Sequence, residues 1–327
     1  MSLCYHLQNF IFLSFAIIET LELKINRTVR KVIGIGETVL DIIFKENKPL
    51  AAVPGGSVFN GIISLGRRGV KCVFISETGK DKVGAMTREY MRENGVSDEC
   101  VSDKRSGQSP LSLAFLDEKN DADYTFYKDY NSEGPAFTMP EIEKDDIVMF
   151  GSYYAVNPLL RPQIEALLKK AEEKGAIVYY DVNFRRSHAH EVVKLMPSIL
   201  DNFEKTTILR GSHEDFGVMF GKEDADRVFK DHVAFYCRNF IMTRGAESVE
   251  LRTKGGVTKS YAVPQIETVS TIGAGDNFNA GLVFGLLQNN IGKDDLDRGL
   301  TEEQWDALIA SATDFSSRCC QQIGNSI

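Results

Sequence analysis

The sequence predicts an α/β fold in which a mostly parallel central sheet lies between layers of helices, with a small β lid added to it. Short runs rich in β-branched residues alternate with runs in which apolar residues recur at helical spacing. This alternation is typical of parallel sheets, because each crossover helix returns the chain to the same edge. The chain has no internal repeat or long linker, so its 327 residues fit one large domain with an insertion.

The individual elements follow from composition and from the glycines and prolines at their ends. The run 31–44 is rich in Val and Ile, and we expect a strand, a glycine break and more strand there. Gly69, Gly95 and Gly175 end helical patterns, and Pro158 stands near the start of one. Further strands are expected at 71–79, 146–151, 176–183, 206–211 and 239–245, a hairpin at 248–263, and helices at 57–69, 82–95, 158–175, 189–202, 212–220, 275–288 and 301–318.

The stretch 109–128 breaks the alternation. Two β-type runs flank a polar turn there, which indicates a hairpin outside the main sheet. We expect a lid made from about 45–54 and 109–130, inserted into a main domain that spans 31–318. Residues 319–327 are then a C-terminal tail.

Residues 1–30 are treated as an N-terminal extension that carries no functional residue. Their apolar run 10–18 is shorter than the roughly 20 residues that span a bilayer. It also lacks the preceding positive charge and the following cleavage site of a signal peptide. The extension could be foreign to the natural chain or could add a strand or helix to the fold. We expect a cytoplasmic protein without a membrane partner.

The charge balance limits the partners of the chain. Lys and Arg number 38 and Asp and Glu number 46, so the net charge is −8. Such a surface repels polyanions, so nucleic-acid binding is not expected, although a local pocket can bind a small anion. The six cysteines have no CxxC or zinc spacing, which favours reduced thiols. His188 and His190 have no third ligand nearby and are expected at the surface.

Several common functional patterns are absent. No Gly-Lys pair completes a P-loop, since Asp81 follows Gly79-Lys80. The stretch 34–39 offers G-x-G but has Val39 in place of the third glycine, which disfavours a dinucleotide-dependent reductase. The chain has no G-x-S-x-G, which disfavours a serine hydrolase.

The stretch Gly273-Ala274-Gly275-Asp276 stands directly before a helical run. Its glycines allow unusual backbone conformations and the close approach of a ligand. If a helix begins there, the N–H groups of Ala274, Gly275 and Asp276 are unpaired and can bind anionic oxygen with help from the helix dipole. Asp276 is then either a general base beside this anion site or a helix cap.

A second polar group is expected at the carboxyl edge of the same sheet. Gly55 and Gly56 allow a tight turn into a helix that contains Asn60, and Asp41 ends the first strand segment. Ligands of α/β proteins bind at this edge. Asp and Asn together offer acceptors and donors for vicinal hydroxyls. Asn60 is open to either role, ligand contact or solvated polar residue.

These motifs resemble the signatures of the PfkB-type, ribokinase-like sugar kinases, in the order found in that family and over about 32–318. The stretch 54–69 resembles the first signature through its glycine pair and Asn60, and 273–281 resembles the second. Three shorter stretches are also similar: 79–84 to the turn between the signatures, 181–185 (DVNFR) to the D-x-N-x-R of fructokinase- and ketodeoxygluconate-kinase-like members, and 243–245 (TRG) to the T-x-G that contacts nucleotide phosphate.

The resemblance implies a ribokinase-like three-layer sandwich with a β lid over the sugar. It implies ATP, Mg²⁺ and a small sugar as ligands, and lid strands that can pair across a homodimer. Asp276 is implied as the base, with Gly273, Ala274 and Gly275 as the anion hole. The implied sugar contacts are Asp41, Gly55, Gly56, Asn60 and Arg185, and the implied nucleotide contacts are Asn183, Glu214 (which also serves Mg²⁺ through water), Thr243, Gly245 and Asn279.

Two departures from the family pattern bear on the site. Ser270 stands where members often have Asp, which leaves the presence of a monovalent-cation site open. Gly211 stands where the N-x-x-E motif usually has Asn, so only Glu214 of that pair is retained. Arg210 could compensate as a cation that faces phosphate, or it could lie on the surface.

The sequence therefore predicts an ATP-dependent kinase of a primary hydroxyl on a small sugar. Fructose or a related ketose is the expected acceptor, because D-x-N-x-R together with Gly36-Glu37 looks fructokinase-like. Ribose, ketodeoxygluconate, a nucleoside and a modified sugar are alternatives. A sugar phosphate is disfavoured because 54–60 contains no Lys or Arg. The second hypothesis is a non-catalytic sugar- or nucleotide-binding protein on the same scaffold, which the presence of Asp276 disfavours.

Overall fold

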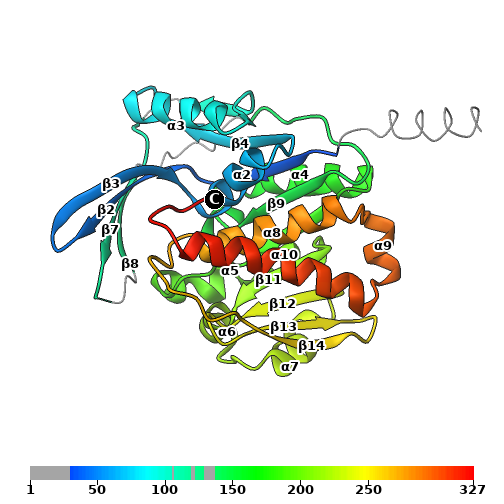
Figure 1. Ribbon diagram of the computed structural model, residues 1–327. Coiled ribbons are helices and arrows are strands. Elements are labelled where there is room, and N and C mark those ends of the chain that lie inside the picture. Colours follow the sequence, from blue (N-terminus) through cyan, green and yellow to red (C-terminus); the bar gives the residue numbers. More distant parts are fainter. Residues whose placement is uncertain (1–29, 105–106, 119–121, 129–136) are drawn as a thin grey trace, which may run out of the picture. The chain divides into compact units, whose positions relative to one another are not determined.

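Strands and helices alternate along the chain as the sequence predicts, and most strands join one sheet (Figure 1). The computed structural model describes residues 30–327 except 105–106, 119–121 and 129–136, so the predicted extension 1–30 lies, apart from Arg30, outside the described residues. The strands of the main sheet are β1 (Val32–Ile35), β4 (Cys72–Thr78), β5 (Val96–Ser97), β6 (Val101–Asp103), β9 (Ile147–Gly151), β10 (Ile177–Asp181), β11 (Ile208–Ser212), β12 (Asn239–Thr243), β13 (Ser248–Thr253) and β14 (Thr258–Ala262).

The main sheet is parallel over most of its width. Its order is β14-β13-β12-β11-β10-β9-β1-β4-β5, with β6 paired to β4. Neighbours from β12 through β5 run parallel, whereas β12, β13 and β14 are antiparallel, which confirms the hairpin predicted at 248–263. Because the strands are parallel, their carboxyl ends meet at one edge, where ligands of such sheets bind.

Helices cover both faces of the main sheet (Figure 1). Side chains of a strand alternate between faces, so Ile177 and Tyr179 of β10 face one helix layer and Val178 and Tyr180 face the other. The first layer contains α2 (Ser57–Arg67), α8 (Ala274–Gln288), α9 (Lys293–Arg298) and α10 (Glu302–Cys320). The second contains α4 (Arg161–Lys174), α5 (Val192–Glu204), α6 (His213–Phe220) and α7 (Ala225–Val228). The helix α3 (Lys82–Glu93) follows β4.

A second, smaller sheet projects from the main body (Figure 1). Its order is β3-β2-β7-β8, formed by β2 (Val39–Lys45), β3 (Lys48–Gly55), β7 (Leu111–Leu116) and β8 (Ala122–Tyr127). The hairpin predicted at 109–128 is confirmed by the antiparallel pair β7 and β8. The turn between β2 and β3 is Glu46-Asn47, and both residues have positive φ, as two-residue hairpins of this twist require.

The small sheet begins earlier in the chain than the predicted 45–54. The whole strand β2 belongs to it, so Asp41 lies in the middle of a small-sheet strand and not at the end of a main-sheet strand. The sequence 37–44 has no glycine or proline that marks the change of sheet, so it reads as a continuation of β1.

Some element boundaries differ from the sequence prediction. The helix α4 begins at Arg161 with Pro162 in its first turn, so Pro158 lies before the helix. A 3₁₀ turn occupies Arg186–Glu191, and α5 therefore begins at Val192 instead of 189. Gly175 ends α4 in the left-handed conformation, as predicted. The short elements α7, α9, β5 and β6 carry too few residues to show a period and were not predicted.

The residues after α10 fold back onto the body of the protein. Asn325 is only 2% exposed and Ser326 only 4%. Asn277 of α8 donates a 3.0 Å hydrogen bond to the carbonyl of Asn325, and the N–H of Ile327 donates to Ser64 of α2 at 3.0 Å. The predicted tail is thus packed between α2 and α8.

The described cysteines, Cys72, Cys100, Cys237, Cys319 and Cys320, are all free thiols. Within the described part of the chain, no helix combines the length and the apolar character needed to cross a membrane.

Candidate active site

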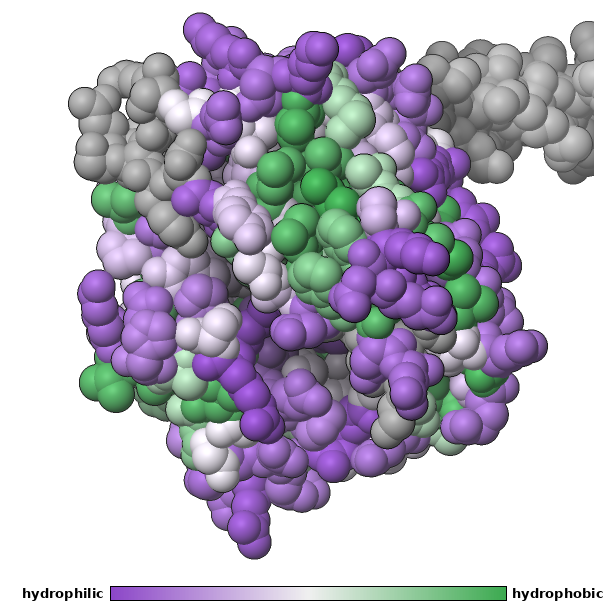
Figure 2. Space-filling model, turned by 90° about the vertical axis from the view of Figure 1, so that its left-hand side faces the viewer, coloured by the Kyte–Doolittle hydropathy of each residue, from purple (hydrophilic) through white to green (hydrophobic). Residues whose placement is uncertain are grey.

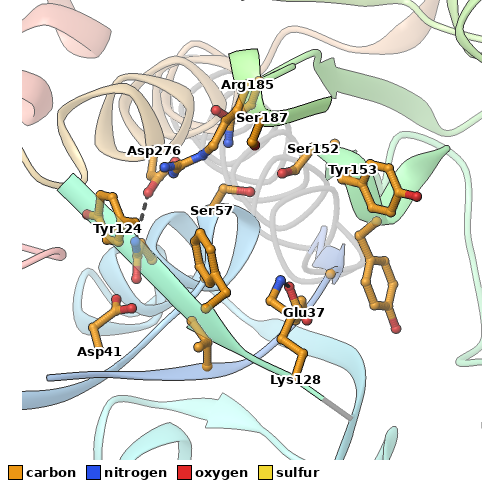
Figure 3. Close-up of a pocket in the computed structure, with 18 of the residues that line it drawn as sticks. Glu37, Asp41, Ser57, Tyr124, Lys128, Ser152, Tyr153, Arg185, Ser187 and Asp276 are labelled. Carbon is orange, nitrogen blue, oxygen red and sulfur yellow. Dashed lines mark hydrogen bonds and ion pairs between the residues drawn. The ribbon is translucent and has the colours of Figure 1, made fainter. Parts of the chain in front are cut away.

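A cavity of about 280 Å³ opens where the carboxyl ends of β1, β9 and β10 meet the first turn of α8 and the small sheet (Figure 3). Pockets for small molecules start at roughly 300 Å³, so its size is suited to a monosaccharide. The predicted site residues that line it are Asp41, Gly56, Asn60, Asn183, Arg185, Gly273 and Asp276.

Asp276 and Asn60 form the centre of the cavity wall. Asn60 Nδ2 donates a 2.7 Å hydrogen bond to Asp276 Oδ2. The two residues meet because α2 packs closely against α8 at Gly61, where an added Cβ would lie 3.0 Å from the Asp276 carbonyl. The structure therefore joins the two glycine-containing stretches, which are far apart in sequence, at a single carboxylate.

Burial raises the pKa of the half-buried Asp276 carboxyl to about 7. The hydrogen bond from Asn60 opposes this rise, nearby Asp181 adds to it, and the charges of Arg185 and Arg210 lower it. A carboxylate with a pKa close to neutrality is suited to accept a proton from a hydroxyl, because general bases work best near the operating pH.

The first turn of α8 contains the residues of the predicted anion site. Gly273 is the N-cap with φ of 75°, a left-handed conformation that favours glycine. An added Cβ there would also lie 2.5 Å from the carbonyl oxygen of Asn325. The Ala274 N–H already donates to the Thr271 carbonyl at 3.2 Å, so the expectation that it is unpaired is wrong. Gly275 and Asp276 are the remaining donors of this turn that can face an anion.

Asp41 lies on the small sheet, on another part of the cavity wall. Ser112 lies beside it in the sheet register and donates to its Oδ1, and Asn325 Nδ2 donates to its Oδ2 at 3.3 Å. Burial raises the pKa of Asp41, and these two hydrogen bonds lower it. Gly55 does not line the cavity. It has no side chain because a Cβ there would collide with the Asp41 carboxylate and Asn325.

The small sheet adds an aromatic and cationic wall that the sequence analysis missed. The Arg185 guanidinium lies 5.0 Å from the Tyr124 ring centroid and 6.0 Å from that of Phe126. Lys128 Nζ lies 4.6 Å from the Phe126 ring and pairs with Glu37 Oε2 at 2.5 Å. Tyr124 and Phe126 alternate along β8 and Lys128 directly follows the strand, so their shared face could have been read from the period of two.

Two non-glycine residues of the cavity wall have left-handed backbone conformations. Ser152 has φ of 60° and follows β9, and Asn183 has φ of 38° and follows β10. The Ser152 N–H donates to the carbonyl of Asp181 at 3.0 Å, and this hydrogen bond holds the carboxyl ends of β9 and β10 together. Strained residues of this kind concentrate at functional sites, so this edge of the sheet is consistent with ligand binding.

The other predicted nucleotide contacts lie outside the cavity. Thr243 ends β12, Gly245 has φ of 57° with open space around it, and Glu214 is exposed in the first turn of α6. Asn279 is buried beneath the site, where it accepts from Tyr179 Oη at 2.8 Å and donates to Asp181 at 2.7 Å. Both ends of its amide are used, so it does not reach the cavity.

Local packing accounts for both departures from the family pattern. A Cβ at Gly211 would lie 2.7 Å from Cε2 of Phe216, so Phe216 fills the space that a larger side chain would need. Ser270 is buried, and its Oγ accepts from the N–H of Ile272 at 3.2 Å. Arg210 is not on the surface: it is 7% exposed and pairs with Asp181 at 2.9 Å.

The described residues contain no group of three or more His, Cys, Asp or Glu side chains that could hold a metal ion. Mg²⁺ bound to a nucleotide needs fewer protein ligands, because phosphates and waters supply most of its coordination. The exposed carboxylate of Glu214 fits that limited role.

The sequence profile of pfkB family carbohydrate kinases matches residues 29–324 of this chain. The chain belongs to this family. It is therefore a carbohydrate kinase, a phosphotransferase with an alcohol group as acceptor.

Two curated relatives illustrate the range of the family around this kinase. A fructokinase of Rhizobium leguminosarum bv. trifolii is 27% identical over 268 residues, which cover 78% of this chain and 79% of the relative. A 5-dehydro-2-deoxygluconokinase of Geobacillus thermodenitrificans is 26% identical over 247 residues, 71% of this chain and 72% of the relative.

Solved structures share the fold of this kinase. A Vibrio cholerae fructokinase bound to fructose, ADP and potassium ion superposes with a TM-score of 0.77 at 18% identity, covering 91% of this chain and 94% of that one. Aminoimidazole riboside kinase from Salmonella enterica, in complex with aminoimidazole riboside and an ATP analog, gives 0.74 at 22% identity, covering 90% and 95%. The predicted ribokinase-like fold is thereby confirmed.

Proposed function

We propose that this kinase transfers the γ-phosphate of ATP to a primary hydroxyl of a small sugar, with fructose or a related ketose as the acceptor. The observation that carries the proposal is the placement of Asp276. Its carboxylate faces a monosaccharide-sized cavity, is held by Asn60, and belongs to the anion-binding first turn of α8. A base and an anion site at one point are what phosphoryl transfer to a hydroxyl requires.

In this mechanism Asp276 accepts the proton of the attacking hydroxyl. The hydroxyl oxygen attacks the γ-phosphorus and forms a new O–P bond. The bond between the γ-phosphorus and the β,γ-bridging oxygen, which lies opposite the attacking oxygen, breaks, and its electron pair stays on ADP. The N–H groups of Gly275 and Asp276 stabilise negative charge on the transferring phosphoryl group. Glu214 is the residue that would hold Mg²⁺ through water beside the nucleotide, and the ion would there neutralise charge on the phosphates.

The sugar is held by Asp41 on the small sheet and by Asn60 beside the base. Asp41 provides an acceptor for one hydroxyl, and the second N–H of the Asn60 amide, next to the one that donates to Asp276, can donate to a neighbouring hydroxyl. The rings of Tyr124 and Phe126 offer apolar surface for a sugar face. The small sheet acts as a lid that excludes water, which otherwise competes as acceptor.

Arg185 favours a second candidate, a kinase of an acidic sugar such as ketodeoxygluconate. Within the described part of the chain Arg185 forms no ion pair, and it points toward the cavity beside Asp276 (Figure 3). An unpaired guanidinium can bind a carboxylate in bidentate fashion, through two parallel hydrogen bonds. The relation to a 5-dehydro-2-deoxygluconokinase supports this candidate, and the likeness to a riboside kinase keeps a nucleoside as a further alternative.

The test is ADP release from MgATP over a panel of fructose, ribose, ketodeoxygluconate and nucleosides. We expect rapid release with fructose and none with Asp276→Asn. Preference for the acidic sugar would establish the second candidate. If well-folded protein phosphorylates no member of the panel, the chain is a sugar- or nucleotide-binding protein on a kinase scaffold.

We also propose that the small sheet pairs with a second copy of the chain. Its face away from the cavity carries Phe44 stacked on Phe115 at 5.0 Å, and Phe115, Leu50 and Tyr127 are exposed. Figure 2, viewed from the side of the small sheet, shows an apolar area bordered by hydrophilic surface. Phe115→Glu is expected to convert a dimer to a monomer by light scattering, and a monomeric unmodified protein would refute the pairing.

A further inference from the structure

Arg210 lies directly behind the first turn of α8. Its side chain comes from β11 and ends close to Gly275, where an added Cβ would lie 3.1 Å from Arg210 Nη2. A side chain at position 275 would therefore press against the guanidinium beneath it. Nη1 donates to Asp181 at 2.9 Å, and Nη2 donates to the hydroxyl of Thr243 at 2.7 Å.

The second of these hydrogen bonds has only one possible direction. A guanidinium can donate but cannot accept, so the oxygen of Thr243 must be the acceptor. The hydroxyl hydrogen of Thr243 is then left to donate elsewhere, and no acceptor for it exists among the residues that the structure describes. Thr243 is 8% exposed at the carboxyl end of β12, beside Ser212 in the sheet register.

Arg210 forms its ion pair with Asp181, and the carboxylate of Asp215 lies near enough to raise the pKa of its guanidinium as well. Asp181 accepts from Arg210 through Oδ1 and from the neutral amide of Asn279 through Oδ2, so one carboxylate is shared by two donors. Arg210 Nε is buried without a hydrogen-bond partner. Buried ion pairs contribute little to stability compared with apolar packing, so an arginine in this place is better explained by an effect on the phosphate site.

We propose that Arg210 is a positioning residue for the nucleotide, which fixes the Thr243 hydroxyl as a donor to a phosphate oxygen and adds a permanent positive charge behind the anion site. Phe216 leaves no room for an Asn side chain at position 211, so Arg210 is the polar side chain that β11 presents beside the first turn of α8. The inference rests on the proposed function, because it requires that a nucleoside phosphate binds at this end of the site.

The test measures binding of MgADP and of adenosine by calorimetry to the full chain and to Thr243→Val, Arg210→Gln and the double variant. A hydrogen bond to a charged group is worth about 1.5–3 kcal/mol, so Thr243→Val is expected to weaken MgADP binding roughly tenfold or more and leave adenosine binding unchanged. Arg210→Gln is expected to do the same. In the Thr243→Val background its effect is smaller, because the two residues act through one contact.

A matched control separates this effect from a loss of packing. Arg252 on β13 is another largely buried arginine, paired with Glu250 at 3.1 Å. Arg252→Gln removes a similar ion pair, and we expect it to leave MgADP affinity unchanged. Arg210→Lys keeps the positive charge but lacks the several planar N–H donors of a guanidinium. Its affinity for MgADP is expected to lie between that of the unmodified protein and that of Arg210→Gln.

Three results would overturn the inference: unchanged MgADP affinity in Thr243→Val, equal weakening of adenosine and MgADP in Arg210→Gln, or fully additive effects in the double variant. If Arg210→Gln does not fold, Thr243→Val and Arg210→Lys decide. Failure of the unmodified protein to bind MgADP would instead refute the proposed kinase function, so the two failures are distinguishable.

Discussion

The two ends of the cavity are built in different ways. At the end where we propose that phosphate binds, called the phosphate end, α8 begins above a buried network in which Asp181 accepts from Arg210 and Asn279. At the acceptor end, side chains of the small sheet, including the half-buried Tyr124 and the exposed Phe126, form an open wall.

Because of this difference, we expect one end of the site to carry out phosphoryl transfer and the other end to select the acceptor. The phosphate end depends on glycine conformations and on a buried hydrogen-bond network, so a change there affects transfer to any acceptor. The acceptor end also presents exposed side chains such as Phe126, and these can be replaced with little cost to the fold. Substitutions at the two ends should therefore have different signatures.

The largest effect is expected at the phosphate end. Asp276→Asn keeps the shape of the side chain and removes the base, so kcat should fall by roughly 10²–10⁴-fold. The affinity for MgADP, measured by calorimetry, should stay within about threefold because the N–H groups remain. Equal losses of kcat and of MgADP affinity would show that Asp276 is structural.

At the acceptor end, Asp41→Asn should raise the KM for the sugar by roughly 10–100-fold, because a charged acceptor of hydroxyl hydrogen bonds is lost. MgADP affinity should not change. Asp123→Asn, an exposed carboxylate on the same sheet, is the matched control and should leave the KM unaltered. A changed affinity for MgADP in Asp41→Asn would contradict the separation of the two ends.

The pH dependence of kcat/KM links both ends through Asp276. The active form is deprotonated, and its pKa is about 7, so kcat/KM should fall about tenfold for each pH unit below that value and level off above it. Asn60→Ala removes a hydrogen bond that lowers the pKa of Asp276, so it should move the midpoint to higher pH. It should also raise the KM for the sugar. A profile that is flat between pH 5 and 8 would exclude Asp276 as the base.

The smallest effect is expected at Lys128. Its charge is already paired with Glu37, and partly exposed ion pairs contribute about 0–1 kcal/mol. Lys128→Met should therefore change the KM for fructose by about threefold or less in steady-state assays. A loss as large as that of Asp41→Asn would show that Lys128 binds the acceptor directly.

Much of the fold and the phosphate end could be predicted from local sequence. Helical spacing and glycine ends identified α2, α3, α4, α8 and α10, and the Gly273–Asp276 stretch indicated a helix that begins at an anion site. The assignment of Asp41 to the main sheet failed because nothing in 37–44 marks a change of sheet. Lys128 was missed because a strand period shows which residues share a face and does not show what that face covers.

The sequence by itself determined the family, the order of the elements and the backbone features that glycine imposes, because these depend on residues close together in the chain. Only the tertiary structure decided the surroundings of Arg210, whose partners Asp181 and Thr243 are 29 and 33 residues away on neighbouring strands. It likewise decided the pKa of Asp276 and the cations of the acceptor wall. Burial and charge are properties of packed neighbours, and those neighbours come together only when the chain is folded.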